Sequence, residues 1–232
     1  MSTEATPKQP YQTMYWRPKQ ISKRSLWVAL AVSLACVIAV EWRPKNRSQD
    51  HSLLVDAATT ADQAMQCIAK QRIDDGHRML AKLDPQGSHL IGPSMSMVTS
   101  KVGSLESKQT SINPNMAAVV TKWLMDSGVK PGDRVAIGAS GSWPALNIAV
   151  YSAAKSLQLR PTIVLSAASS QYGANSPSMM WVDMERLLRE SGIIPETFRP
   201  VGVSLGGLHD RAAGMTDQTR EMLQQAIARN EL

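Results

Sequence analysis

From about residue 86 to the C-terminus, short apolar runs alternate with stretches of helical periodicity, and this alternation restricts the chain to few folds. Strand–helix–strand units of this kind form parallel sheets with helices packed against them. We therefore predict an α/β fold for residues 86–232, a Rossmann-like three-layer domain with a mostly parallel sheet. The expected strands are 134–140, 162–169 and 198–207, and the expected helices are 114–128, 144–159, 176–192 and 216–230.

Prolines mark the ends of several of these elements. Asn113 and Pro114 provide an N-cap and a first helical residue for the helix at 114–128. Ser176 and Pro177 provide the same pair for the helix at 176–192. Pro200 lies in the third expected strand. Because proline has no amide hydrogen, that strand is expected at an edge of the sheet.

Residues 25–40 contain no charged side chain and predict a membrane-spanning helix. A helix of this length rises about 24 Å, slightly less than a hydrocarbon core of about 30 Å. Trp27 and Trp42 lie at its two ends, where aromatic side chains prefer the membrane interface. More Lys and Arg precede the run than follow it, which favours a cytoplasmic tail over 1–24 and a signal anchor over 25–42. The bulk of the chain would then lie outside a cell membrane that the chain crosses once.

Three other interpretations of this run stay open. A cleaved signal peptide needs small residues at its cleavage site, and the sequence after the run offers no good one. A lipoprotein signal would end at Cys36, but Val37 and Ile38 continue the apolar run. A buried core helix would not need basic and Trp residues at both ends. The second cysteine, Cys67, lies outside the run, so two unpaired cysteines are expected.

Residues 43–85 predict a linker followed by a helical segment, before the α/β domain begins at about residue 86. Residues 43–50 are polar, and apolar residues then recur at helical spacing over 51–83. Turn-forming residues at 83–88 end the segment.

The positive charge of the chain is concentrated in its N-terminal tail. The net charge is +6, and residues 1–47 contain eight Lys or Arg against two Glu. Residues 86–232 contain thirteen basic and eleven acidic side chains, so the expected globular domain is nearly balanced. A nucleic-acid partner requires basic residues clustered on the folded domain, and none is expected.

Loops rich in glycine and serine follow the three expected strands, at 138–142, 169–175 and 204–210. Ligands of parallel α/β sheets bind beyond the carboxyl ends of the strands. We expect the three loops to meet at one edge of the sheet, where the N-terminus of the following helix favours an anion. A carboxylate-rich ligand would suit such a site. The side chains expected to orient it are Ser140, Ser142 and Asn175.

The loop Gly138-Ala-Ser-Gly-Ser matches no phosphate-binding or dinucleotide-binding motif. A phosphate-binding loop would continue with Gly-Lys-Ser or Gly-Lys-Thr, and Pro144 stands where a dinucleotide-binding motif needs its third glycine. Zinc-type spacing is absent as well, so we predict neither a cofactor nor a metal. The alternative is a tight strand-to-helix turn with no ligand.

The same loop differs by one residue from the G-x-S-x-G motif of serine hydrolases. A hydrolase would use Ser140 as nucleophile, His209 as its base and Asp183 to orient the imidazole. Ser142 replaces the last glycine of the motif, and Asp183 falls inside an expected helix. We therefore keep this catalytic set as an alternative and lean toward a protein without catalytic activity.

Residues 92–115 form a long segment rich in Ser and Thr. Such segments in compact domains are usually functional or disordered. One interpretation is disorder. The other is a loop that folds over the site and brings Lys101 or Lys108 to an anionic ligand, with Trp143 as one wall.

Four ordered segments carry a resemblance to a known family: GSLESKQTSINPNMAAVV, GDRVAIGASGSWPALNIAV, SSQYGANSPSMMWVDME and VSLGG. Over about residues 88–230 the chain resembles the poly-gamma-glutamate system protein family (PgsW-like proteins). The resemblance implies a role in bacterial synthesis and export of this capsule polymer, beside the membrane components of its synthase. It also implies one shared site, made of Ser140, Gly141, Ser142, Gly173, Asn175 and Asp183.

Two functions are therefore expected. The first is a membrane-anchored accessory protein that binds the anionic polymer or a partner subunit of the synthase. The second is a hydrolase or transferase that acts on gamma-glutamyl bonds through Ser140.

Overall fold

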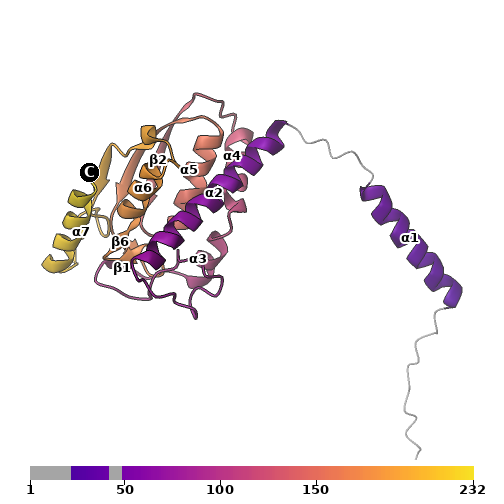
Figure 1. Cartoon of the computed structure of the whole chain (residues 1–232), viewed down its shortest axis with the longest axis horizontal. Coiled ribbons are helices and arrows are strands. Elements are labelled where there is room, and N and C mark those ends of the chain that lie inside the picture. The colour runs from indigo at the N-terminus through magenta and orange to yellow at the C-terminus, as the bar shows by residue number, and fades with distance from the viewer. Residues whose placement is uncertain (1–21, 42–48) are drawn as a thin grey trace, which may run out of the picture. The chain divides into compact units, whose positions relative to one another are not determined.

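The computed structural model describes residues 22–41 and 49–232 of the 232-residue chain (Figure 1). The chain divides into two compact units, Met1–Asn46 and Arg47–Leu232. The expected cytoplasmic tail up to residue 21 and most of the expected linker lie outside the described residues.

In the first unit the structure describes helix α1 (Lys23–Glu41). Over Lys23–Val40 this helix is long and apolar enough to span a membrane or to act as a signal sequence. Its described side chains are exposed. Cys36 on α1 and Cys67 in the second unit are both free cysteines.

Three parallel strands form the main sheet of the second unit, in the order β2, β3, β7. Strand β2 (Arg134–Ser140) pairs along its whole length with β3 (Arg160–Ser166), and β7 (Gly202–Ser204) pairs with the end of β3. The strand predicted at 134–140 is confirmed at both ends. The predicted edge position of the third strand is also confirmed, because β7 lies at the end of the strand order.

Two smaller strand pairs come from segments that the sequence assigned differently. Strand β1 (Thr99–Lys101) pairs in parallel with β4 (Ser169–Ser170). Strand β5 (Asn175–Ser176) pairs antiparallel with β6 (Met179–Met180). The segment 92–115 therefore contributes regular structure, including β1 and helix α3 (Leu105–Ser111).

Helices cover one face of the main sheet. Helices α5 (Pro144–Ser156) and α6 (Trp181–Glu190) connect its strands and contact them, and η1 (Glu196–Phe198) contacts β3. Alternate strand residues are exposed on the opposite face, and Val164 retains 50% exposure there. The inward-facing residues, all buried, are Ile137, Ala139, Ile163 and Leu165.

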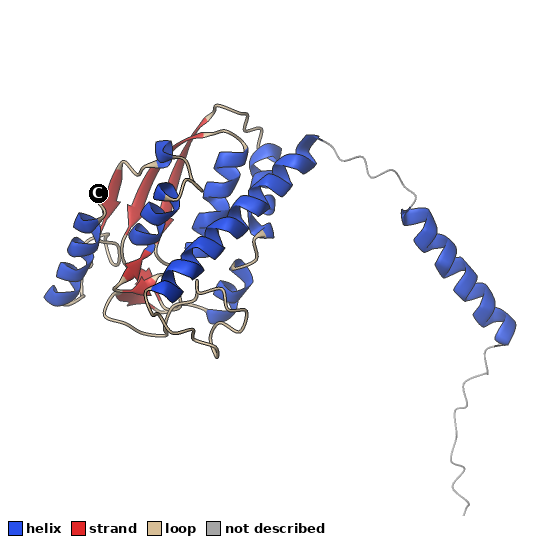
Figure 2. Ribbon diagram, in the orientation of Figure 1, coloured by secondary structure: helices blue, strands red, loops and turns tan. Residues whose placement is uncertain are grey.

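A second layer of helix lies over the first. Helix α2 (Gln49–Asp74) packs on α5 and α4 (Asn115–Asp126), and in Figure 2 it lies beyond α5 as seen from the strands. Helix α7 (Asp217–Arg229) packs against α6. The fold is α/β with a mostly parallel sheet, as predicted. The three-layer Rossmann-like arrangement is not confirmed, because within residues 49–232 the sheet has helices on one face.

Helix α2 supplies part of the core of the second unit. Its Ala57, Ala61, Ala64 and Ile68 are fully buried. The sequence predicted a helical segment separate from the α/β domain, whereas the structure includes α2 in the same compact unit. The helix ends at Asp74, shortly before Gly76, which has a left-handed φ of 75°.

Helix α6 begins four residues later than the sequence predicted. Ser176 and Pro177 were expected at its N-terminus, but Met180 is the N-cap. Residues 175–180 instead form the β5–β6 hairpin. Asp183, in the first turn of the helix, accepts a hydrogen bond of 2.7 Å from the Met180 amide and so fixes the start of the helix there.

The burial of α2 predicts the effect of enlarging one of its alanines. Ala61→Leu should lower the free energy of unfolding by about 1–3 kcal/mol, because its side chain faces a packed core. The measurement is urea unfolding of the full chain in detergent micelles, followed by tryptophan fluorescence. Gln63→Leu places the same side chain on the exposed side of the helix and should change stability little. Equal effects of the two variants would contradict the assignment of α2 to this core.

Candidate functional site

A pocket of about 470 Å³ lies where strands β2 and β3 end. Ser140 and Ser166, the last residues of these strands and partners in register, form part of its wall. Other parts of the wall come from β1 and from the loop after β7. The lining residues are Ser100, Lys101, Ser140, Ser142, Ser166, Ala168, Gly207, Leu208, His209 and Asp210.

Two of the three loops expected at this edge line the pocket. Loop 138–142 contributes Ser140 and Ser142, and loop 204–210 contributes four consecutive residues that begin at Gly207. Loop 169–175 does not belong to the pocket wall. The carboxyl ends of the parallel strands therefore meet at one site, as the sequence predicted, and the third loop has another role.

Hydrogen bonds hold the loop between β2 and α5 in one conformation. The Ser142 amide donates to the Ser140 hydroxyl at 3.0 Å, and the Asn147 side chain on α5 donates to the Ser140 carbonyl at 2.8 Å. The Gly141 amide donates to the Ser166 carbonyl of β3 at 3.2 Å. These hydrogen bonds therefore fix the backbone that carries Ser140 and Ser142 at the N-terminus of α5. The partial positive charge of the helix dipole at this end favours an anion.

Loop 169–175 packs behind the pocket, against the first loop. A side chain on Gly173 would place its Cβ 2.6 Å from the Gly141 carbonyl oxygen and 2.4 Å from the Ser169 hydroxyl. Asn175 is fully buried, and its amide donates to Pro93 O and to the Thr99 hydroxyl. Gly141 and Gly173 thus serve the packing of the two loops, Asn175 joins the second loop to residues 93–99, and none of the three lines the pocket.

The side chain of Lys108, on α3, joins these two loops. It is 2% exposed, and its ammonium donates to the Ser142 carbonyl, to the Ser170 hydroxyl at 2.9 Å and to the Gln171 carbonyl at 2.9 Å. All three of its donors are therefore satisfied. The ammonium also lies 4.9 Å from the ring centroid of Trp143, within the range of a cation–π interaction.

The two lysines at the site leave it with positive charge. Burial, and to a smaller extent the charge of Lys101, lowers the pKa of Lys108 to about 8, so the ammonium is still largely protonated at pH 7. In the described part of the chain, no carboxylate forms an ion pair with Lys101 or Lys108. Lys101 is exposed on the pocket wall, and Lys108 lies behind Ser142. Both charges favour an anionic ligand.

A strained turn brings His209 and Asp210 to the pocket. Both residues have left-handed backbone conformations, with φ of 56° and 57°, and the Arg211 amide donates to the Leu208 carbonyl across them. Consecutive non-glycine residues in this region are uncommon and cost free energy. The carboxylate of Asp210 accepts a hydrogen bond of 3.1 Å from the Ser204 hydroxyl at the end of β7.

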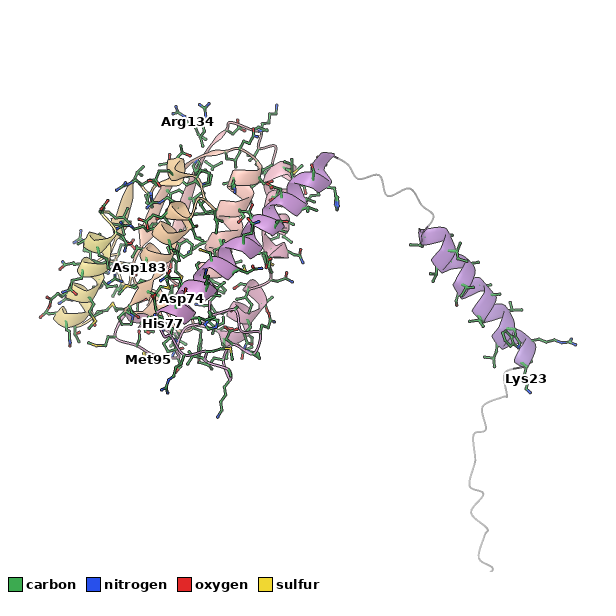
Figure 3. The ribbon with its side chains drawn as sticks, viewed as in Figure 1. Lys23, Asp74, His77, Met95, Arg134 and Asp183 are labelled. Carbon is green, nitrogen blue, oxygen red and sulfur yellow. The ribbon has the colours of Figure 1, made fainter. Side chains whose placement is uncertain are left out.

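The structure does not bring the three residues of the hydrolase alternative together. Ser140 and His209 line the same pocket, but Asp183 is not part of its wall. Asp183 lies at the start of α6 (Figure 3), where it accepts hydrogen bonds from Arg229 and from the Asn230 amide at 2.6 Å. The carboxylate that lines the pocket belongs instead to Asp210, the residue directly after His209.

Metal ligation finds no support among the residues that the structure describes. No group of three or more His, Cys, Asp or Glu side chains there is placed to hold a metal ion. The pocket instead presents hydroxyls, one ammonium, one imidazole and the carboxylate of Asp210.

Comparison with known proteins gives no family for this chain. No protein-family model matches it, and neither the curated proteins nor the solved structures contain a significant match. Any functional conclusion therefore depends on the geometry of the site and on the sequence itself.

Three polar residues of the pocket were not singled out from the sequence: Ser100, Ser166 and Asp210. Ser166 ends β3 in register with Ser140, so aligning the ends of the two expected strands could have indicated it. Ser100 lies in a strand of three residues, too short to show a periodic pattern. Asp210 closes the predicted loop 204–210, but no local signal distinguishes it from a solvated surface residue.

The pKa of Lys108 predicts a pH dependence of stability. Its ordinary pKa is 10.5 and its value in the folded chain is about 8, so between these values the unfolded chain binds the proton more strongly. The contribution of Lys108 to stability therefore increases as the pH rises through this window and is lost as the pH falls toward 8. The unfolding free energy of the wild type, relative to Lys108→Met, should increase by about 1 kcal/mol from about pH 7 to pH 9.

Urea unfolding of both proteins across this pH range measures the difference. Lys122→Met removes an exposed lysine and should show no such dependence. A pH-independent difference between wild type and Lys108→Met would contradict a buried, desolvated ammonium.

Proposed function

We propose that this chain is a membrane-anchored accessory protein of bacterial poly-gamma-glutamate synthesis and export, and that its pocket binds the carboxylates of the polymer. The observation that carries the proposal is the composition of the pocket. Four serine hydroxyls, Lys101 and His209 line it beside one carboxylate, Asp210, which accepts a hydrogen bond from Ser204. The ammonium of Lys108 lies behind it without a carboxylate partner among the described residues. Such donors suit a carboxylate, which only accepts hydrogen bonds.

The resemblance in four ordered segments supports the polymer as the source of these carboxylates. Helix α1 supports attachment to the membrane, because it is long and apolar enough to span one. With the N-terminal tail in the cytoplasm, the pocket would face the extracytoplasmic side, where the exported polymer emerges. The membrane components of the synthase are the partner subunits that the resemblance implies.

A second candidate function is hydrolysis or transfer of gamma-glutamyl bonds. The observation that favours it is that Ser140 and His209 line one pocket. A nucleophilic Ser140 would need His209 to take its proton, with Asp210 rather than Asp183 available to orient the imidazole. Against it, the Ser140 hydroxyl already accepts a hydrogen bond from the Ser142 amide, which would lower its nucleophilicity.

The binding proposal predicts loss of affinity when the exposed lysine of the pocket is neutralised. Lys101→Gln should weaken binding of a gamma-glutamyl trimer about tenfold, since a hydrogen bond to a charged group contributes about 1.5–3 kcal/mol. Calorimetric titration of the full chain in nanodiscs measures this. Lys82→Gln removes an exposed cation that does not line the pocket and should leave the affinity unchanged. Absence of trimer binding by the wild type would overturn the proposal.

The enzymatic alternative makes a separate prediction. Wild type incubated with long poly-gamma-glutamate should shorten it, and Ser140→Ala should lose this activity at least about a thousandfold, as expected for a missing nucleophile. Size-exclusion chromatography of the polymer measures its length. If the length stays constant while trimer binding is observed, the alternative is excluded and the binding function stands.

A further inference from the structure

The main sheet leaves one face uncovered in the described structure. A side chain added at Gly138 would meet nothing within 4 Å, and Val164 is half-exposed. Parallel sheets are normally covered on both faces. We call this surface the outer face; its residues are Arg134, Ala136, Gly138 and Ser140 of β2, Arg160, Thr162, Val164 and Ser166 of β3, and Gly202 and Ser204 of β7.

The outer face contains a groove that is continuous with the pocket. The groove has a volume of about 440 Å³ and is lined by residues of all three strands. Ser140, Ser166 and Asp210 line both the groove and the pocket. A ligand seated in the pocket therefore has an open path along the outer face.

Two arginines stand at the far end of this face. Arg134 and Arg160 are partners in the register of β2 and β3, and both are exposed. Like charges on directly opposed strand residues repel each other. Among the described residues, no carboxylate forms an ion pair with either guanidinium. In Figure 3 Arg134 lies at the opposite end of the domain from Met95.

The charges at both ends and the small residues between them fit a long, thin anion. Six residues of strand separate Arg134 from Ser140, a distance of about 20 Å. Between the ends, Gly138, Val164 and Gly202 are small or apolar, and Asp210, where the groove meets the pocket, is the charged residue that lines the groove. An extended chain could place carboxylates at the arginines and at the pocket, and rest its aliphatic backbone on the strands.

Other occupants fit less well. Two strands of seven residues and one of three, about 4.8 Å apart and rising about 3.3 Å per residue, present roughly 300 Å². A stable dimer buries about 800 Å² on each partner, so this face is too small to hold a second copy by itself. Single-stranded nucleic acids bind to aromatic side chains, and no residue that lines the groove is aromatic.

We infer that the outer face is a binding track for an extended polycarboxylate chain, running from Arg134 and Arg160 to the pocket. This inference rests on the proposed function and adds to it that the protein grips an internal stretch of the polymer as well as single carboxylates. Long chains should then bind more tightly than short ones.

The experiment compares a gamma-glutamyl trimer with long poly-gamma-glutamate, titrated into the full chain in nanodiscs of zwitterionic phosphatidylcholine. Wild type should bind the long chain at least about tenfold more tightly per chain than the trimer. Arg134→Gln/Arg160→Gln should remove most of that advantage and leave trimer affinity within about twofold, since each charged hydrogen bond contributes about 1.5–3 kcal/mol. Lys70→Gln/Lys82→Gln removes equal charge from exposed positions outside the groove and should preserve the advantage.

The outcomes separate the inference from the proposed function. If the trimer binds but the arginine variant keeps the full advantage of the long chain, the track is wrong and the pocket remains. If neither ligand binds, both proposals fail. Tighter binding of single-stranded DNA through the same arginines would overturn the polycarboxylate. A stable dimer that Val164→Arg converts to monomer would show instead that a second copy covers the face.

Discussion

The ammonium of Lys108 fixes the arrangement on which the site depends. It joins Ser142, in the loop after β2, to Ser170 at the end of β4 and to Gln171, which follows it. A buried cation is unfavourable unless its donors are satisfied, and here three oxygen acceptors and the Trp143 ring surround it. An apolar residue of similar size would avoid the desolvation cost of the charge. The charge nevertheless adds positive potential behind the pocket, and this is the property that a site for carboxylates needs.

The strands could be predicted from the sequence, but their surroundings could not. The run at 134–140 is apolar or small at almost every position, which is typical of a strand buried on both faces. In the structure Ile137 and Ala139 face the helices, whereas Ala136 and Gly138 face outward and are exposed. Small residues at the outward positions thus give this strand the sequence pattern of one that is buried on both faces. The prediction of helices on both faces followed from the alternation of strands and helices, and the small residues of this strand did not contradict it.

The parts of the candidate site that follow from one physical rule were predicted from the sequence. The parts that depend on packing between distant segments were not. Ser140 and Ser142 follow from the position of ligands at the carboxyl ends of parallel strands. Gly141 and Gly173 were expected near the ligand, yet each removes a side chain that would collide with the neighbouring loop. A glycine in a loop serves either purpose, and the sequence does not distinguish them. The contacts of Lys108 span 34 to 63 residues of sequence, beyond the reach of any local pattern.

The uncovered sheet face determines what kind of binding this fold can offer. Covering roughly 300 Å² of mixed surface gains at most about 7 kcal/mol, at about 25 cal/mol per Å² of apolar area. Association costs about 4–15 kcal/mol in lost freedom before any gain appears. The apolar part of the outer face therefore cannot hold a ligand alone, and the charges at its two ends must supply the rest. These exposed charges are screened by salt and exchange their ligands readily. If the proposed track binds a polymer, weak contacts repeated along it would permit a long chain to move past the protein while remaining bound, whereas one tight pocket would hold it in place.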